Sequence, residues 1–180
     1  MSIKKQGLAE DKGRFYLSGL IVFSTKRKDP KTGEIRESIS IEHNIFVDNS
    51  ARLYRNLMFG ESEPVKLNFG DLNFTDTDDW DNPPPAQPTD STMVNKLGEV
   101  PIQDQQKVDV NGNPGIQYTF VMPYDQYNGL NTTDGTTKIV EWGLATDTDD
   151  TLYTKKNRRV VYKDQYIEIT IVYTISLQRV

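Results

Sequence analysis

The stretch that predicts the fold most directly is YIEITIVYTISLQ, residues 166–178, which alternates apolar and polar side chains almost without a break. The apolar positions share one face of an extended strand: Ile167, Ile169, Ile171, Tyr173, Ile175 and Leu177. Their neighbours lie on the other face, because successive side chains of a strand point to opposite sides. A period of two predicts a half-buried β-strand. At about 3.3 Å per residue it spans about 40 Å, roughly twice the usual strand length, so it must bend or run along a large sheet.

The same strand signal recurs upstream, between turn residues. Strands are predicted over residues 15–25, 35–41, 64–74, 100–110, 116–123, 138–145 and 152–154. The turn signals Asp29-Pro30 and Thr32-Gly33 make the first two strands a long hairpin with a basic tip, and residues 111–115, NGNPG, close a second hairpin. Helices of 10–15 residues do not alternate with these strands, which disfavours a parallel α/β sheet. The predicted fold class is mainly β, an antiparallel β-sandwich of about seven or eight strands.

One segment changes to a helical period, residues 48–60, DNSARLYRNLMFG. Capping side chains are available at residues 48–50, Leu53, Leu57 and Met58 share one face, and Gly60 can adopt a left-handed stop conformation. The sequence therefore predicts one short amphipathic helix packed on the sheet.

Length and composition limit the class of protein. The 180 residues fit one domain that can bury a core without disulfides, and the chain has no cysteine. Thiolate catalysis, cysteine-zinc sites and disulfide scaffolds are therefore excluded. The first residues lack an apolar run and no window approaches a membrane span, so we expect neither a signal peptide nor membrane insertion. The formal net charge of −5 provides no basic field for nucleic acid or anionic membranes.

Two segments stand apart from the predicted sheet. Residues 1–13 are polar and aperiodic, which predicts a flexible N-terminal arm before a single domain over residues 14–180. Inside that domain, residues 75–88, TDTDDWDNPPPAQP, combine aspartates that repel one another with prolines that lack a backbone donor. We expect an exposed acidic loop followed by a stiff, extended linker.

No constellation of residues predicts catalysis. His43 is the one histidine, and no nucleophile elbow accompanies it, so a satisfied or solvent-facing histidine is the simpler interpretation. Glu141 and Glu168 could form a pair of catalytic carboxylates, but with 26 acidic residues some pair always meets the required spacing. The solvent-facing side of a sheet explains both. We therefore expect no enzyme activity, no cofactor and no metal.

A calcium site is the alternative that the aspartates suggest, because hard cations prefer several oxygen ligands from one loop. Counted from Asp71, the EF-hand template fails, since Asp76 stands at the glycine position and Asn82 at the glutamate position. An irregular site within residues 71–81 or 147–150 stays open, and a solvated loop is the default.

Aromatic residues raise a second alternative, a carbohydrate-binding module. Trp80, Tyr124 and Tyr127 could stack on sugar rings if they shared one exposed face. Trp142 lies in an apolar strand and is predicted to be core. Trp80 lies in the acidic loop, where it either anchors that loop or enters a pocket of a partner.

Charged residues gather at separate points along the chain, which favours contacts between copies. Acidic loops and basic tips on one chain can pack head to tail, and contacts that close by rotation make rings. The predicted partner-contact residues are Lys26, Arg27, Lys28, Asp76, Asp78, Asp79, Trp80, Lys155, Lys156, Arg158 and Arg159. Without interleaved stacking aromatics, the basic points do not favour nucleic acid.

The segment KIVEWGLATDTDDTLYT, residues 138–154, resembles a family of small virion proteins of tailed bacteriophages, associated with the tail, neck or baseplate. Its late signature is a strand Ile-x-Glu-x-Gly-Leu, a short Leu-rich strand, a basic residue and a long alternating strand. The matching residues are Ile139, Glu141, Gly143, Leu144, Leu152, Tyr153, Lys163 and residues 168–177. Upstream, residues 44–47, 48–58, 67–70 and 89–97 follow the family's order, whereas Thr154 replaces a frequent arginine.

This resemblance, over about residues 44–177, implies a non-enzymatic structural subunit of a virion. It implies a multi-copy ring or collar that bridges neighbouring components, with partners among copies of itself and tail, portal, neck or fibre proteins. Such a protein would be made in the host cytoplasm and reside in the virion. A capsid decoration protein and the carbohydrate-binding module are the alternatives.

Overall fold

The computed structural model describes residues 15–58 and 65–179. The predicted N-terminal arm, residues 1–13, and the helix stop at Gly60 lie outside the described residues. The described parts of the chain form nine strands and one helix: β1 (Phe15–Lys28), β2 (Ile35–His43), β3 (Ile45–Phe46), α1 (Ser50–Met58), β4 (Val65–Gly70), β5 (Lys96–Val110), β6 (Asn113–Met122), β7 (Thr137–Thr146), β8 (Leu152–Lys163) and β9 (Ile167–Arg179).

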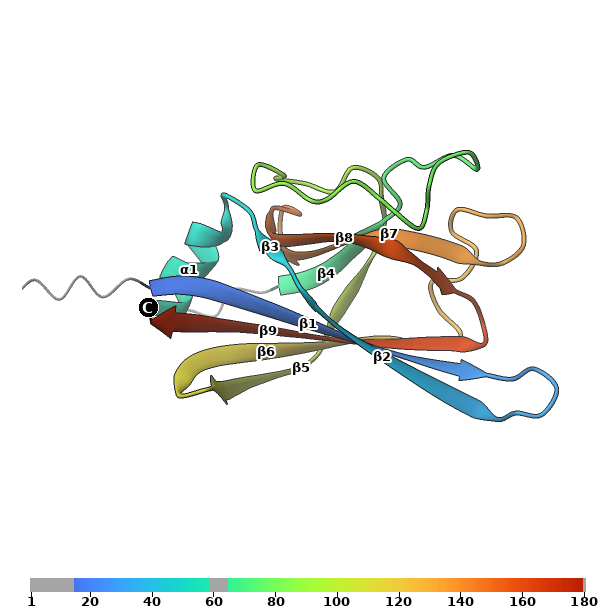
Figure 1. The fold of residues 1–180 in the computed structure, drawn as a ribbon, viewed down its shortest axis with the longest axis horizontal. Coiled ribbons are helices and arrows are strands. Elements are labelled where there is room, and N and C mark those ends of the chain that lie inside the picture. The colour runs from blue at the N-terminus through green and yellow to red at the C-terminus, as the bar shows by residue number, and fades with distance from the viewer. Residues whose placement is uncertain (1–14, 59–64, 180) are drawn as a thin grey trace, which may run out of the picture.

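The strands form one antiparallel sheet in the order β2-β1-β9-β6-β5-β4-β7-β8-β3. The sheet folds over on itself, so that β2, β1, β9 and β6 form a lower layer and β4, β7, β8 and β3 an upper layer (Figure 1). The predicted class, mainly β and antiparallel with one short helix, is confirmed. The two layers are halves of a single sheet that is nearly closed into a barrel.

Strand β5 connects the two layers because it pairs with a different neighbour at each end. Its residues 96–101 pair with β4 and its residues 102–110 with β6, and the register shifts between Ile102 and Asp104. An extra residue at such a point bends a strand and increases its twist. The bend takes the sheet from the upper layer to the lower one.

The long alternating stretch is strand β9, at the centre of the lower layer. It pairs with β1 over its whole length and with β6 on its other side. Ile169, Ile171 and Tyr173 are completely buried, as the alternation predicted. They face Trp142 and Phe69 of the upper layer in one apolar core, and the predicted burial of Trp142 is confirmed.

The crossover before helix α1 connects the two layers. The chain leaves β2 in the lower layer and reaches β3 in the upper layer through Asn44. Any side chain at Gly19 of β1 would collide with the Asn44 amide, so glycine there lets Asn44 keep its position in the crossover. Helix α1 then begins at Ser50, whose backbone N–H donates to Val47 O, and buries Leu53 in the core.

Candidate interaction surface

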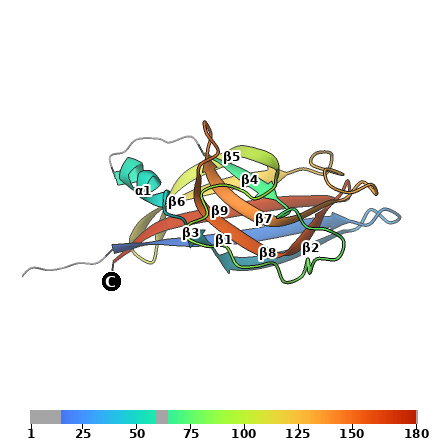
Figure 2. The same ribbon diagram turned by 90° about the horizontal axis from the view of Figure 1, so that it is seen from above.

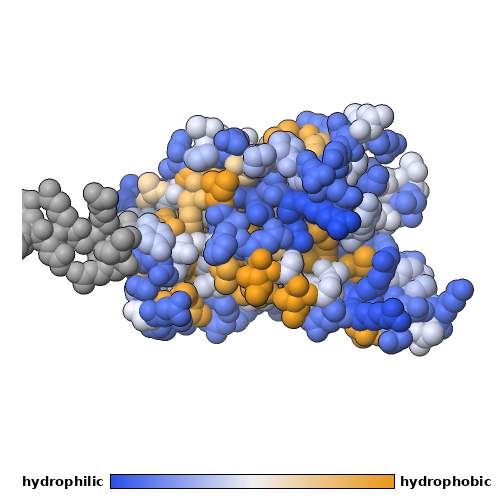
Figure 3. Space-filling model, viewed as in Figure 1, coloured by the Kyte–Doolittle hydropathy of each residue, from blue (hydrophilic) through white to orange (hydrophobic). Residues whose placement is uncertain are grey.

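Strand β2 has its apolar side chains on the outside. Ser40 and Glu42 lie opposite the buried core residues Phe23 and Ile21 of β1, so the polar face of β2 points inward. The outward face carries the isoleucines, with exposed fractions of 57% for Ile35, 65% for Ile39 and 65% for Ile41. They form an apolar strip over β2 on the face in Figure 3. Side chains of this kind on an exposed strand are typical of an interaction site.

The outer edge of β2 also presents free backbone groups. Lys28 N–H donates to Tyr166 O on the β9 side, and Asp29 N–H donates to Glu34 O on the β2 side. Bonding direction alternates along a strand. The even-numbered residues of β2 therefore bond β1, while the N–H and C=O groups of Glu37, Ile39 and Ile41 point away from the sheet. In the described chain no strand pairs there, since β2 ends the strand order.

The opposite side of the sheet is sealed by the loop of residues 75–88. Val160 N–H of β8 donates to Trp80 O at 2.9 Å, and the Asn157 amide donates to Pro84 O at 2.9 Å. Arg159 Nε adds a bond of 2.7 Å to Asp81. Prolines suit this position because the loop offers carbonyl oxygens and needs few donors of its own. The loop covers the edge of β8: it lies above the upper layer in Figure 1 and runs alongside β8 in Figure 2. At the other end of the strand order, β2 has no strand on its outer edge in the described chain.

Trp80 anchors this loop, the first of its two predicted roles. Its indole N–H donates to Thr75 O at 2.9 Å, and its ring meets Phe74 edge-on at 5.0 Å between centroids. The Lys138 ammonium lies 4.9 Å from the ring centroid. Tyr127 packs separately on Phe69, and the hydroxyl oxygen of Tyr124 is buried. The three aromatics of the carbohydrate alternative therefore do not line one exposed platform.

Lys155, predicted as a partner contact, is instead buried under the segment that follows the loop. Its ammonium lies 2.5 Å from Glu141 Oε1 and 3.2 Å from Asp90 Oδ2, and the exposed fractions of the Lys155 and Glu141 side chains are 1% and 0%. Val94 N–H donates to both oxygens of Glu141 at 3.0 Å. The Lys155 prediction is wrong because Asp90 and Val94 hold their segment over the outer face of β7 and β8. Glu141 was expected on the solvent-facing side of a sheet, and this prediction is also wrong, because its side chain is buried in the pair with Lys155.

The remaining charged residues of the predicted contact set are largely engaged within the chain. The ion pairs are Lys26–Glu168 at 3.5 Å, Arg27–Asp164 at 3.7 Å, Asp76–Lys138 at 3.6 Å, Lys156–Glu42 at 3.3 Å and Arg158–Glu42 at 3.1 Å. Asp78 accepts a bond from Thr75 Oγ1, and Asp79 accepts one from Asn82 Nδ2. Lys28 lies on the exposed hairpin. The acidic loop and the basic residues at 155–159 thus meet inside one chain, through Asp81 and Arg159.

Near residues 147–150, where the alternative hypothesis placed a calcium ion, the positive charge beside the aspartates comes from two lysines. Asp150 Oδ1 lies 2.8 Å from the ammonium of Lys66 and 2.8 Å from that of Lys96. These two hydrogen bonds hold the pKa of the Asp150 carboxyl well below its usual range. Among the residues described, no three His, Asp or Glu side chains gather as metal ligands would.

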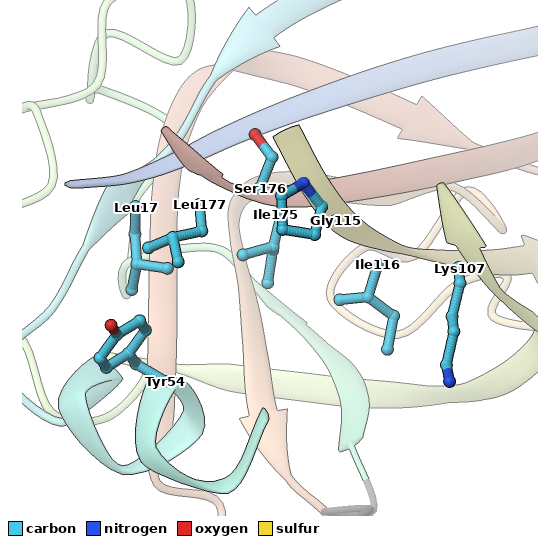
Figure 4. Close-up of a pocket in the computed structure, with 9 residues that line it drawn as sticks. Leu17, Tyr54, Lys107, Gly115, Ile116, Ile175, Ser176 and Leu177 are labelled. Carbon is cyan, nitrogen blue, oxygen red and sulfur yellow. The ribbon is translucent and has the colours of Figure 1, made fainter. Parts of the chain in front are cut away.

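One cavity of about 250 Å³ opens between α1 and the adjoining ends of β1, β6 and β9 (Figure 4). Its walls are mainly apolar: Leu17, Tyr54, Pro114, Ile116, Ile175 and Leu177. Lys107 and Ser176 also line it, without forming a cluster that could carry chemistry.

No family model, curated protein or solved structure matches this chain. In the part of the chain that is described, no helix is long and apolar enough to cross a membrane.

Proposed function

We propose that this chain is a non-enzymatic structural subunit of a tailed-phage virion, present in several copies in the tail, neck or baseplate region. The observation that carries the proposal is the contrast between two edges of the sheet, the edge of β8 and the edge of β2. One is sealed by a dedicated loop, and the other, β2, has exposed isoleucines and free backbone groups. The resemblance of residues 44–177 to phage virion proteins supplies the setting.

Assembly through β2 relies on strand addition. Edge strands attract other strands because their N–H and C=O groups lack partners, and soluble proteins usually protect them with charges, prolines or bulges. On its outward face, β2 carries three isoleucines with a single carboxylate, Glu37, among them. Main-chain hydrogen bonds would supply affinity, and burial of the isoleucines would add to it. Copies joined in this way would bridge neighbouring components of the particle.

The test is co-expression with the neighbouring virion proteins, followed by size-exclusion chromatography with light scattering. We expect assemblies that contain this chain in several copies, and a doubly substituted Ile39→Lys, Ile41→Lys variant that does not join them. Val94→Lys is the matched control, because Val94 is 56% exposed on the upper layer, away from β2. A chain that stays monomeric with every neighbour would contradict the proposal.

A further inference from the structure

We propose that the partner at this edge is a second copy of the same chain, paired antiparallel through β2 about a two-fold axis at Ile39. The inference rests on the proposed assembly function and names the contact between copies. In this register residue n of one copy lies opposite residue 78 − n of the other, so all nine residues of β2 are paired.

The backbone groups of β2 are self-complementary in this register. The outward N–H and C=O groups belong to odd-numbered residues, as the bonds of Lys28 and Asp29 establish. The numbers of two paired residues add up to 78, which is even, so odd-numbered residues lie opposite odd-numbered residues. Each outward N–H or C=O group therefore meets an outward group of the other copy. Ile39 lies opposite Ile39 of the second copy and exchanges two hydrogen bonds with it. The two lower layers become one continuous sheet.

The side chains fit the same register. Directly opposite residues lie on the same face of a sheet. On the outer face Ile39 therefore lies opposite Ile39 of the second copy, and Ile41 of each copy lies diagonal to it. Ile41 lies opposite Glu37 and Ile35 lies opposite His43, so the apolar contact is centred on the two-fold axis. On the inner face Arg36, whose side chain is 80% exposed, lies opposite Glu42 of the second copy, and this pair occurs twice. No like charges lie directly opposite each other.

A two-fold contact also explains why an exposed strand of this kind need not lead to fibres. The loop of residues 75–88 occupies the edge of β8, beside β3 at the other end of the strand order in the described chain. Pairing of two identical β2 edges uses up both, so growth through this contact stops at two copies. A separate head-to-tail contact would still let such pairs close into a ring.

A single thiol tests this geometry in a chain that has no cysteine of its own. In Ile39→Cys the two Cα atoms across the axis would lie about 5.5 Å apart, within the range that a disulfide spans. Glu37→Cys is the control on the same face. In this register its two Cα atoms would lie about 13 Å apart or more, beyond the range of a disulfide.

We expect mild oxidation to convert most of the Ile39→Cys chain, and little of the Glu37→Cys chain, into a covalent dimer at concentrations where light scattering shows association. Equal cross-linking of the two variants, or none of Ile39→Cys while the chain still assembles with virion proteins, would overturn the two-fold pairing and leave the assembly function standing. In Ile39→Lys we expect self-association at least thirtyfold weaker, the usual effect at an interface hot spot, with Val94→Lys unchanged. Equal weakening in both lysine variants would also overturn the pairing.

Discussion

Substitution of Glu141 by glutamine leaves a buried lysine without its closest carboxylate. Lys155 and Glu141 are both shielded from water, and 2.5 Å separates the ammonium from Glu141 Oε1. Removal of one partner from a buried ion pair usually costs about 3–5 kcal/mol, because the other charge is left uncompensated. Asp90, at 3.2 Å, keeps part of that compensation in place. We therefore expect Glu141→Gln to lower the free energy of unfolding by about 3 kcal/mol, the low end of that range.

A double-mutant cycle in urea measures this effect. Lys155→Met should cost a similar amount, since it leaves the Glu141 carboxylate with only Val94 N–H as a donor. The combined Glu141→Gln, Lys155→Met variant should lose less than the sum of the two single losses, with a coupling energy of about 2–3 kcal/mol. The exposed Asp76→Asn control, which breaks a 3.6 Å surface pair, should cost below about 1 kcal/mol. Single losses under about 1 kcal/mol that add without coupling would refute the reasoning.

Three further outcomes follow from other charged groups of the structure. The pKa of Asp150 is lowered in the folded chain, so the stability that its carboxylate contributes is present above about pH 4 and is lost as the pH falls further. Between about pH 5 and 2.5 the urea midpoint of Asp150→Asn should therefore fall less than that of the unsubstituted chain. Burial lowers the pKa of Lys163 to about 8, whereas in the unfolded chain it is about 10.4. Since the unfolded chain then holds more protons, the urea midpoint should rise between about pH 8 and 10, and this rise should be absent in Lys163→Met. Arg158 lies 4.1 Å from the ring centroid of Phe23, so Arg158→Ala should lower the free energy of unfolding by about 2 kcal/mol. Arg159→Ala, at the exposed neighbouring residue, should lower it by less than about 1 kcal/mol. Equal losses in thermal or urea unfolding would contradict this prediction.

The sequence predicted the elements whose pattern depends on local residues. The alternation of residues 166–178 predicted the central strand β9, and the change of period after Val47 predicted the helix from Ser50. Strand β3 was missed because two residues, Ile45 and Phe46, carry no period. The paths of long loops could not be predicted from the sequence either, because a proline-rich loop has the same residue pattern whether it extends into solvent or lies along β8.

The candidate surface was missed for a related reason. The pattern of residues 35–43 separates isoleucines from polar side chains but does not say which face is inside. Strand β1 is apolar on both faces, with Val22 beside Phe23, so it gives no direction either. The register between the strands decides the matter, because Phe23 lies opposite Ser40. The charged contact residues were predicted without their neighbours in space, so the burial of Lys155 under residues 90–94 could not be foreseen.

Hydrogen exchange of the β2 amides tests the central claim, assembly of copies through the open edge, most directly. Ser38 and Ser40 bond β1, so their amides should exchange slowly at every protein concentration. The amides of Ile39 and Ile41 point outward; they should exchange fast in dilute solution and slow down at concentrations where light scattering shows association. If these two amides stay fast in the associated protein, the copies meet through another surface and the account of β2 is wrong.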